Sequence, residues 1–173
     1  FGLELTKTRS KAYLLLGLRS TLSTEVRFLD AGRPGAEFRT LHPREQKMEY
    51  RVDHRGGKFY ILTNDRAKNF KLMEAPVSDP SKKNWKTLLS HRPTVLLSEL
   101  DLFRDHLVVT EREAGLRKVR ITNFTNNQTH YIDFPEPLYT VGVDRNPDFN
   151  STLLRFTYTS LVTPMSVYDY DCL

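Results

Sequence analysis

The chain has 173 residues, 39% of them hydrophobic and 27% charged, which is the balance of one ordinary soluble globular domain. No apolar run approaches the roughly 18 residues that a membrane-spanning helix needs, so the composition argues against a membrane protein or a membrane partner. The formal net charge is +5, but Lys and Arg are spread along the chain, and the densest clusters, 7–11 and 117–120, accompany strand-like segments. We therefore expect a solvated basic surface rather than a nucleic-acid site.

The cysteine count and the first residues bear on the cellular compartment. A single cysteine, Cys172, excludes an intrachain disulfide and favours a reducing compartment. The opening residues, FGLELTKTRSK, lack the long apolar core of a secretory signal, so we expect a cytoplasmic location. Sequons at Asn123, Asn127 and Asn150 are short patterns that arise by chance, and we expect them to carry no sugar.

An internal repeat of about 47 residues runs through the chain. Four short apolar runs, rich in β-branched and aromatic residues, recur at spacings of 46 to 48 residues. They are AYLLLGL (12–18), KFYILT (58–63), HLVVT (106–110) and TLLRFTY (152–158). Each is bounded by Gly, Asn, Asp or Ser, which is typical of a strand buried on both faces.

Further strands are expected around each apolar run. Leading strands precede the runs at 3–6, 50–54, 96–103 and 139–144. Alternating strands follow a polar loop at 26–28, 70–72, 119–121 and 167–169. Trailing strands close the first three units at 37–41, 85–89 and 129–134, and the fourth unit has none. Gly56-Gly57 supplies the positive φ that a two-residue hairpin turn between 50–54 and 58–63 requires.

Four antiparallel strands every 47 residues are typical of a β-propeller blade. A β-sandwich also has short strands, but it gives no reason for four units to share one internal order. Only 97–105 has some helical spacing, and it lies where a leading strand is due. We predict an all-β fold, a β-propeller arc of about four four-stranded antiparallel blades. The blades cover approximately 1–45, 46–92, 93–136 and 137–173, the last one incomplete.

The alternative to an arc is a four-bladed propeller closed by its own ends. Closure needs a strand from one terminus to complete the blade at the other terminus. Residues 1–5 already serve as the leading strand of the first unit, so nothing is left to complete the fourth. This pattern, and a chain that starts at Phe1 rather than Met, favours an arc cut from a larger ring.

No catalytic, cofactor or metal motif is present. The chain has no G-x-S-x-G elbow, no H-E-x-x-H, no P-loop and no paired cysteines. The five histidines are scattered, at positions 42, 54, 91, 106 and 130. His54 follows Asp53, which could orient its imidazole, but we expect the two side chains to hold the local turn. We assign no catalytic, cofactor-binding or metal-binding residue and expect no cofactor.

Carboxylates gather in two neighbouring segments. Glu99, Asp101 and Asp105 lie in SELDLFRD, and Glu111 and Glu113 lie in TEREAG. They could line a channel mouth that faces a basic ligand. The simpler interpretation, which we favour, is that they lie on exposed hairpin turns. The tyrosines and phenylalanines follow strand spacing and are expected in the core between blades rather than in a base-stacking platform.

Several segments resemble the prolyl oligopeptidase family of serine peptidases. YTSLVTP (158–164) followed by MSVYDYD is similar to the last-blade signature of that family. VDHRGGKFYILTNDRAKNFKL (52–72) resembles its oligopeptidase B branch, and RSTLSTEVRFLDA (19–31) and LVVTEREAGLRKVRI (107–121) are similar to the same branch. The resemblance runs in register over nearly the whole chain. It departs at Cys172-Leu173, where the family continues into a turn and a trailing strand.

The resemblance implies a seven-bladed propeller that covers an α/β-hydrolase domain. In that family the Ser-Asp-His triad and the acidic residues that select Arg or Lys substrates belong to the hydrolase domain. That domain is absent from these residues, so no catalytic residue is carried over and this chain alone should be inactive. The implied function is the substrate-gating propeller of a serine endopeptidase that cleaves short peptides after basic residues.

Two other functions stay open at this stage. A propeller without an attached enzyme could serve as a protein- or peptide-binding module, because its loops stand on a rigid scaffold. A nucleic-acid binder driven by the net charge would show a steep loss of affinity with salt. An arc would also expose two apolar blade faces, so we expect the isolated chain to self-associate.

Overall fold

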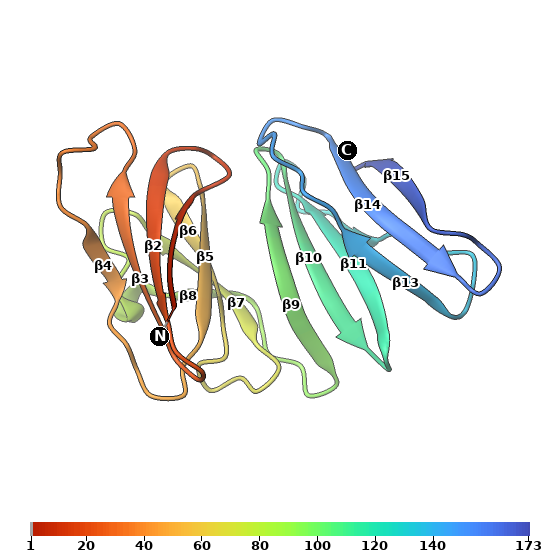
Figure 1. Cartoon of the computed structure of the whole chain (residues 1–173), viewed down its shortest axis with the longest axis horizontal. Coiled ribbons are helices and arrows are strands. Elements are labelled where there is room, and N and C mark those ends of the chain that lie inside the picture. Colours follow the sequence, from red (N-terminus) through yellow and green to blue (C-terminus); the bar gives the residue numbers. More distant parts are fainter. Residues whose placement is uncertain (1) are drawn as a thin grey trace. The chain divides into compact units, whose positions relative to one another are not determined.

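The computed structural model describes residues 2–173 (Figure 1). These residues form 15 strands and one short 3-10 helix, η1 (Lys82–Asn84). The all-β prediction is therefore confirmed. Within these residues, no helix is long and apolar enough to span a bilayer. The chain divides into two compact units, residues 1–92 and 93–173, and each is described by itself.

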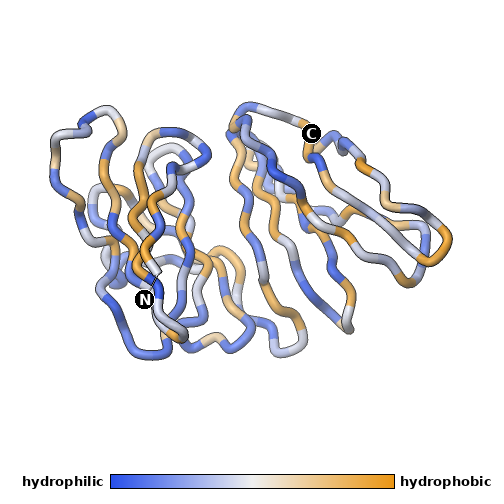
Figure 2. Tube along the Cα trace, viewed as in Figure 1, coloured by the Kyte–Doolittle hydropathy of each residue, from blue (hydrophilic) through white to orange (hydrophobic). Residues whose placement is uncertain are grey.

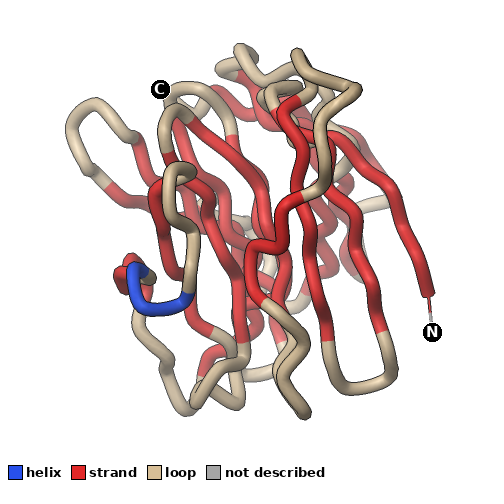
Figure 3. Tube along the Cα trace, turned by 90° about the vertical axis from the view of Figure 1, so that its left-hand side faces the viewer, coloured by secondary structure: helices blue, strands red, loops and turns tan. Residues whose placement is uncertain are grey.

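The first unit contains two four-stranded antiparallel sheets, in which each strand pairs with the next along the chain. The first sheet is β1 (Gly2–Lys7), β2 (Tyr13–Arg19), β3 (Thr24–Asp30) and β4 (Arg39–His42). The second is β5 (Tyr50–Arg55), β6 (Lys58–Thr63), β7 (Lys71–Pro76) and β8 (Lys86–Leu89). Figure 3 shows these strands in red, joined by short loops, with η1 in blue before β8.

The second unit contains one four-stranded and one three-stranded antiparallel sheet. The four strands are β9 (Val95–Leu102), β10 (His106–Glu113), β11 (Leu116–Asn123) and β12 (Thr129–Tyr131). The three are β13 (Tyr139–Val143), β14 (Leu153–Ser160) and β15 (Ser166–Asp171). The segment with some helical spacing is the strand β9, and the last sheet lacks a trailing strand, both as predicted.

The hairpin turns have the backbone that the sequence requires. Gly56 has φ +59° between β5 and β6, where a residue with a Cβ atom would be strained. Ala114 and Gly115, with φ 50° and 85°, join β10 to β11 in the same way. Phe70 has φ 62°, so β7 begins one residue later than predicted. The last predicted trailing strand is also shorter than expected, because β12 ends at Tyr131.

Each unit has its own apolar core, built from the alternation of side chains along the strands. Figure 2 shows apolar residues in orange and polar residues in blue along the trace of these strands. In the first unit, the rings of Tyr13, Phe28 and Phe59 meet edge to face, with centroids 4.9 to 6.0 Å apart. In the second unit, the core joins Val108 and Ile121 of one sheet to Leu154 and Phe156 of the next. Burial between sheets is thus the main stabilising contact, as expected for stacked blades.

The outer faces of the first and last sheets differ. In the first sheet, Leu3 and Leu5 are 71% and 60% exposed and lie opposite Leu18 and Leu16 of β2, so this face is apolar, as predicted. The last sheet was also expected to present an apolar face, and there the expectation is wrong in part. Next to the exposed Val167 and Leu153, Arg155 of β14 lies directly opposite Asp169 of β15 and binds it through two hydrogen bonds of 2.7 and 2.8 Å.

Candidate functional site

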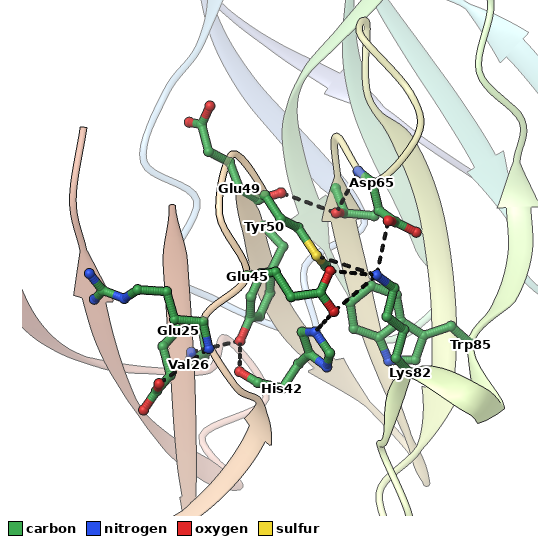
Figure 4. Close-up of polar contacts among 12 residues, drawn as sticks. Glu25, Val26, His42, Glu45, Glu49, Tyr50, Asp65, Lys82 and Trp85 are labelled. Atoms are coloured by element: carbon green, nitrogen blue, oxygen red, sulfur yellow. Dashed lines mark hydrogen bonds and ion pairs between the residues drawn. The ribbon is translucent and has the colours of Figure 1, made fainter. Parts of the chain in front are cut away.

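A charged network centred on Lys82 connects three loops of the first unit (Figure 4). The Lys82 ammonium, in η1, donates to Glu45 Oε2 at 3.0 Å and to Asp65 Oδ1 at 2.9 Å. Its Nζ also lies 3.6 Å from Met48 Sδ. Glu45 Oε1 is 2.6 Å from the Nε2 atom of His42, at the end of β4. The network thus fixes the β4–β5 and β6–β7 loops to η1.

The charges in this network stabilise one another. Burial opposes the charge on Lys82, but its hydrogen bonds to Asp65 and Glu45 outweigh that cost and raise its pKa. The hydrogen bond from Lys82 holds the pKa of Glu45 below its usual value. Burial works to raise the pKa of Asp65, but the Lys82 contacts prevail and lower it. An ammonium that is held protonated in this way is no nucleophile or base, so we interpret the network as structural.

Lys82→Met is expected to lower the free energy of unfolding of the first unit by about 1 kcal/mol at neutral pH, because it removes the cation that two carboxylates share. Carboxylates with lowered pKa values contribute stability above their unfolded pKa values, near 4, and lose it as the pH falls through the folded values. The difference between the wild-type chain and the variant should therefore shrink below about pH 4. Urea unfolding, followed by the fluorescence of the single tryptophan, Trp85, measures it.

Lys83→Met is the matched control for that variant. The Lys83 side chain is 75% exposed and its contact to Asp79 is one surface ion pair. Such a pair contributes little to stability, so the control should unfold near the wild-type midpoint. Equal losses in the two variants, or a loss that does not depend on pH, would show that the shared contacts of Lys82 are not what stabilises the loops.

Ser10, His54 and Asp53 lie close together and superficially resemble a catalytic triad. Ser10 Oγ lies 2.8 Å from His54 Nδ1. Asp53 Oδ1, however, accepts from the backbone amides of Arg9 and His54 at 3.1 and 2.8 Å. The backbone role that was expected for Asp53 is therefore present, although the segment it holds is the β1–β2 loop rather than the Gly56-Gly57 hairpin.

The burial of His54 supports a structural role for the Ser10–His54 pair. Only 5% of His54 is exposed, and burial lowers its pKa. Ser10 Oγ also lies 3.0 Å from Thr8 Oγ1 and accepts from the Ala12 amide at 3.4 Å, so its hydroxyl is engaged within its own loop. A general base that activates a nucleophile must reach a substrate as well, and a buried imidazole does not. We interpret the pair as a link between β5 and the β1–β2 loop.

The carboxylates of the second unit do not form one cluster. Glu99 and Asp101 are half-buried within β9 and pair in the ladder with Thr110 and Val108, so their assignment to an exposed hairpin turn is wrong. Glu111 follows Thr110 on the opposite face of β10. Glu111 is only 1% exposed, so its assignment to an exposed hairpin turn is wrong. The buried carboxylate accepts a hydrogen bond from Tyr131 at 3.0 Å and lies 3.7 Å from Arg120, and these contacts offset part of the cost of burying its charge.

The same contacts account for the basic cluster at 117–120. Lys118 Nζ donates to Glu113 Oε2 at 2.5 Å, and Arg120 lies beside Glu111. Arg117 reaches the backbone carbonyl of Val141 at 3.5 Å. These basic side chains therefore make contacts within the second unit, both along one sheet and between its two sheets.

The described residues also show little that could hold a small ligand or metal. Within residues 2–173, no group of three or more His, Cys, Asp or Glu side chains could hold a metal ion. A hollow of about 340 Å³ lies beside η1 and is lined by Lys58, Lys83, Lys86 and Trp85 among others. Glu74 pairs with Lys58 there at 2.7 Å. The hollow is lined by surface lysines, and its described lining residues include no nucleophile paired with a general base.

Sequence reasoning missed the Lys82 network entirely. His42, Glu45, Asp65 and Lys82 are scattered over 40 residues, and no motif spacing links them. Only the stacking of two sheets and the turn at η1 bring them together. The burial of Glu111 had no local signal, because Glu111 lies in the polar half of β10, whose sequence is HLVVTERE.

Comparisons with known proteins relate the whole chain to one family of peptidases. A family model described as "Prolyl oligopeptidase, N-terminal beta-propeller domain" matches residues 1–173. Dipeptidyl aminopeptidase BI from Pseudoxanthomonas mexicana is 35% identical over 172 residues, which are 99% of this chain and 24% of that protein. Protease 2 from Moraxella lacunata is 28% identical over 171 residues, with the same two coverages.

Solved structures of peptidases of this kind have the same fold over these residues. Oligopeptidase B from Trypanosoma brucei, in a closed form with covalently bound antipain, superposes with a TM-score of 0.91 at 25% identity. Oligopeptidase B from Leishmania major superposes with a TM-score of 0.89 at 27% identity. Each match covers 99% of this chain and 26% of the other. The chain thus spans about a quarter of the length of the relatives that it matches.

Proposed function

The chain belongs to the family of prolyl oligopeptidase N-terminal β-propeller domains, and we propose that it is the substrate-gating portion of a longer serine peptidase of the oligopeptidase B type. The family match confirms the predicted fold class and resemblance. The observation that carries the proposal is the superposition of 99% of the chain on oligopeptidase B. The remaining three quarters of such a protein would include the hydrolase domain, the main partner of this chain.

In this proposal the propeller controls which substrates reach the catalytic site and takes no part in the chemical step. Sheets that bury apolar side chains against one another within each unit are stiff, so we expect a short or unfolded peptide to pass the propeller and a folded protein to be excluded. The propeller also keeps bulk water from the catalytic site when the two domains are closed. Acyl transfer then follows the logic of the serine triad in the hydrolase domain. We propose a cytoplasmic location for the whole protein and short peptides as its substrates, and the single cysteine supports a reducing compartment.

The purified chain is expected to hydrolyse no peptide or ester substrate. The structure supports this because the hydrogen bond between Ser10 and the buried His54 joins a loop to β5 and offers no site for a substrate. The measurement is the release of product from a chromogenic arginine ester, with Ser10→Ala as the control for any residual signal. Hydrolysis that the Ser10→Ala substitution abolishes would contradict the prediction and would make the pair an active site.

The cleavage specificity is tested on the full-length gene product, because the comparisons name two kinds of peptidase. We propose an endopeptidase that cleaves after basic residues. The relative from Pseudoxanthomonas mexicana is named a dipeptidyl aminopeptidase, which favours the release of dipeptides as a second candidate. A peptide with one internal arginine is digested with a free and with an acetylated N-terminus, and the products are identified by mass spectrometry. Cleavage after arginine in both supports the first candidate, and dipeptides from the free peptide alone support the second.

The gating role needs a separate comparison of substrates. The full-length protein should cleave a short arginine peptide and should leave the same sequence intact within a folded protein. Equal cleavage of the two substrates would contradict a gate. A full-length coding sequence that lacks a G-x-S-x-G elbow followed by Asp and His downstream of the propeller would contradict the peptidase itself.

A further inference from the structure

The β14–β15 turn exposes an unusual amount of apolar surface. Leu161 is 91% exposed, Val162 80% and Met165 76%. The three residues lie within a span of five, in the turn that joins β14 to β15. Figure 1 shows this turn at one end of the hairpin. A single exposed leucine needs no explanation, but a contiguous apolar group at the tip of a turn marks an interaction site. We call residues 161–165 the apolar tip.

Hydrogen bonds hold the backbone of the apolar tip in one conformation. Ser160 Oγ accepts from the amides of Val162 and Thr163 at 3.2 and 2.9 Å. The Ser160 amide and the Thr159 hydroxyl both donate to the Thr163 carbonyl, at 3.0 and 3.1 Å. A turn that is already ordered loses little conformational entropy when it binds, so this construction favours docking.

Glu136 attaches the apolar tip to the neighbouring β12–β13 loop. Its Oε1 accepts from the Thr163 hydroxyl at 2.6 Å, and its Oε2 accepts from the Tyr158 hydroxyl. These bonds, first of all the one from Thr163, lower the pKa of Glu136, so the carboxylate stays ionised and bound. The charge nearest to the tip is therefore already engaged, and residues 157–168 contain no charged side chain. The surface that covers the tip must be apolar.

The corresponding turns of the other sheets have a different character. The β6–β7 turn, NDRAKNF (64–70), carries three charged residues, and the β10–β11 turn is the pair Ala114-Gly115. The β2–β3 turn presents one apolar side chain, Leu22, at 55% exposure. Nothing in the packing of a sheet therefore requires three exposed apolar side chains at this position.

We infer that the apolar tip docks into an apolar recess of the hydrolase domain of the same polypeptide. This inference rests on the proposed function, since it needs the three quarters of the relatives' length that this chain does not span. A domain in the same polypeptide is present at a high effective concentration, so a contact of three side chains is sufficient. The tip would then hold the propeller closed over the catalytic site, as a contact that opens and closes with the gate.

The test compares the full-length protein with its Leu161→Ser/Val162→Ser double variant. Each buried leucine or valine shifts such an equilibrium by on the order of tenfold, so the open form should rise by roughly a hundredfold. The readouts are the rate of limited proteolysis between the two domains and the cleavage of a folded protein substrate, both of which should increase. Leu88→Ser, at a 40% exposed leucine on β8, is the matched control and should change neither rate.

Two further measurements separate the possible failures. The isolated chain with the double substitution should unfold at the wild-type midpoint, because the tip is exposed there, so misfolding is excluded directly. A wild-type full-length protein without activity on short peptides would overturn the proposed function and this inference together. An active wild-type protein whose double variant resists proteolysis equally would overturn this inference alone. A dimer of the isolated chain that the double substitution dissolves would also overturn it, by identifying a second copy as the partner.

Discussion

Phe59→Ala is expected to lower the free energy of unfolding of the first unit by about 3–5 kcal/mol, because it removes a large side chain from the centre of the core. Phe59 is fully buried in β6, and its ring centroid lies 4.9 Å from that of Phe28 and 5.3 Å from that of Tyr13. Its loss leaves a cavity between the two sheets and removes both ring contacts. The two sheets then lose a large part of the apolar contact between them, although other core residues remain.

Urea unfolding followed by Trp85 fluorescence measures this effect in the first unit specifically, because Trp85 is the single tryptophan and precedes β8. Leu88→Ala is the control for the loss of an apolar side chain from an exposed position, and it should cost less than about 0.5 kcal/mol. A loss below about 1 kcal/mol for Phe59→Ala would mean that the sheets do not depend on this contact.

The strands could be predicted because each one carries a local signal. Each buried middle strand carries a short apolar run, and the hairpin at Gly56 needs a positive φ that the sequence supplies. The errors lie at strand ends, such as Phe70 and the residues after Tyr131, where the backbone leaves the ladder. A left-handed phenylalanine is unfavourable by itself, so tertiary packing rather than propensity determines that boundary.

The candidate sites could not be predicted in the same way, because they depend on which strands become neighbours. The pairing of Ser10 with His54 joins two sheets across 44 residues, and sequence reasoning coupled His54 to Asp53 instead. The sequence pattern indicated a turn at Glu111, but the β10–β11 ladder extends to Glu113 and Glu111 is buried. Local patterns identify strands. Whether a charged side chain can be buried depends on the hydrogen-bonding or charged side chain that an adjacent strand places beside it.

The unequal end faces refine the expectation that the isolated chain self-associates. Leu3 and Leu5 offer an apolar face at β1, whereas the Arg155–Asp169 pair makes the outer face of the last sheet mixed. We therefore propose that self-association, where it occurs, uses the β1 face. This face would be covered by another blade in a longer propeller, so its leucines are a signature of stacking rather than of a dimer.

Tyr50→Phe is the second substitution with a large expected effect. The effect is expected because the Tyr50 hydroxyl binds backbone groups at a β-bulge. The β3–β4 ladder shifts register between Val26 and Arg27, so one residue of β4 has no partner. The buried hydroxyl of Tyr50 fills the resulting gap: it accepts from the Val26 amide at 2.8 Å and donates to the His42 carbonyl at 2.5 Å (Figure 4). Phenylalanine would leave both backbone groups buried without this partner, at a cost of roughly 2–4 kcal/mol.

The pH dependence of unfolding gives this prediction a second readout. Burial raises the pKa of Tyr50, so its neutral hydroxyl contributes stability that is fully present below the unfolded pKa of about 10 and is lost as the pH rises above it. The Tyr50→Phe variant should be less stable at neutral pH and should lose less stability above about pH 10 than the wild-type chain does. Tyr168→Phe, at a 46% exposed tyrosine, is the matched control and should reproduce the wild-type curve at neutral pH. A Tyr50→Phe chain as stable as wild type would show that the bulge is satisfied in another way.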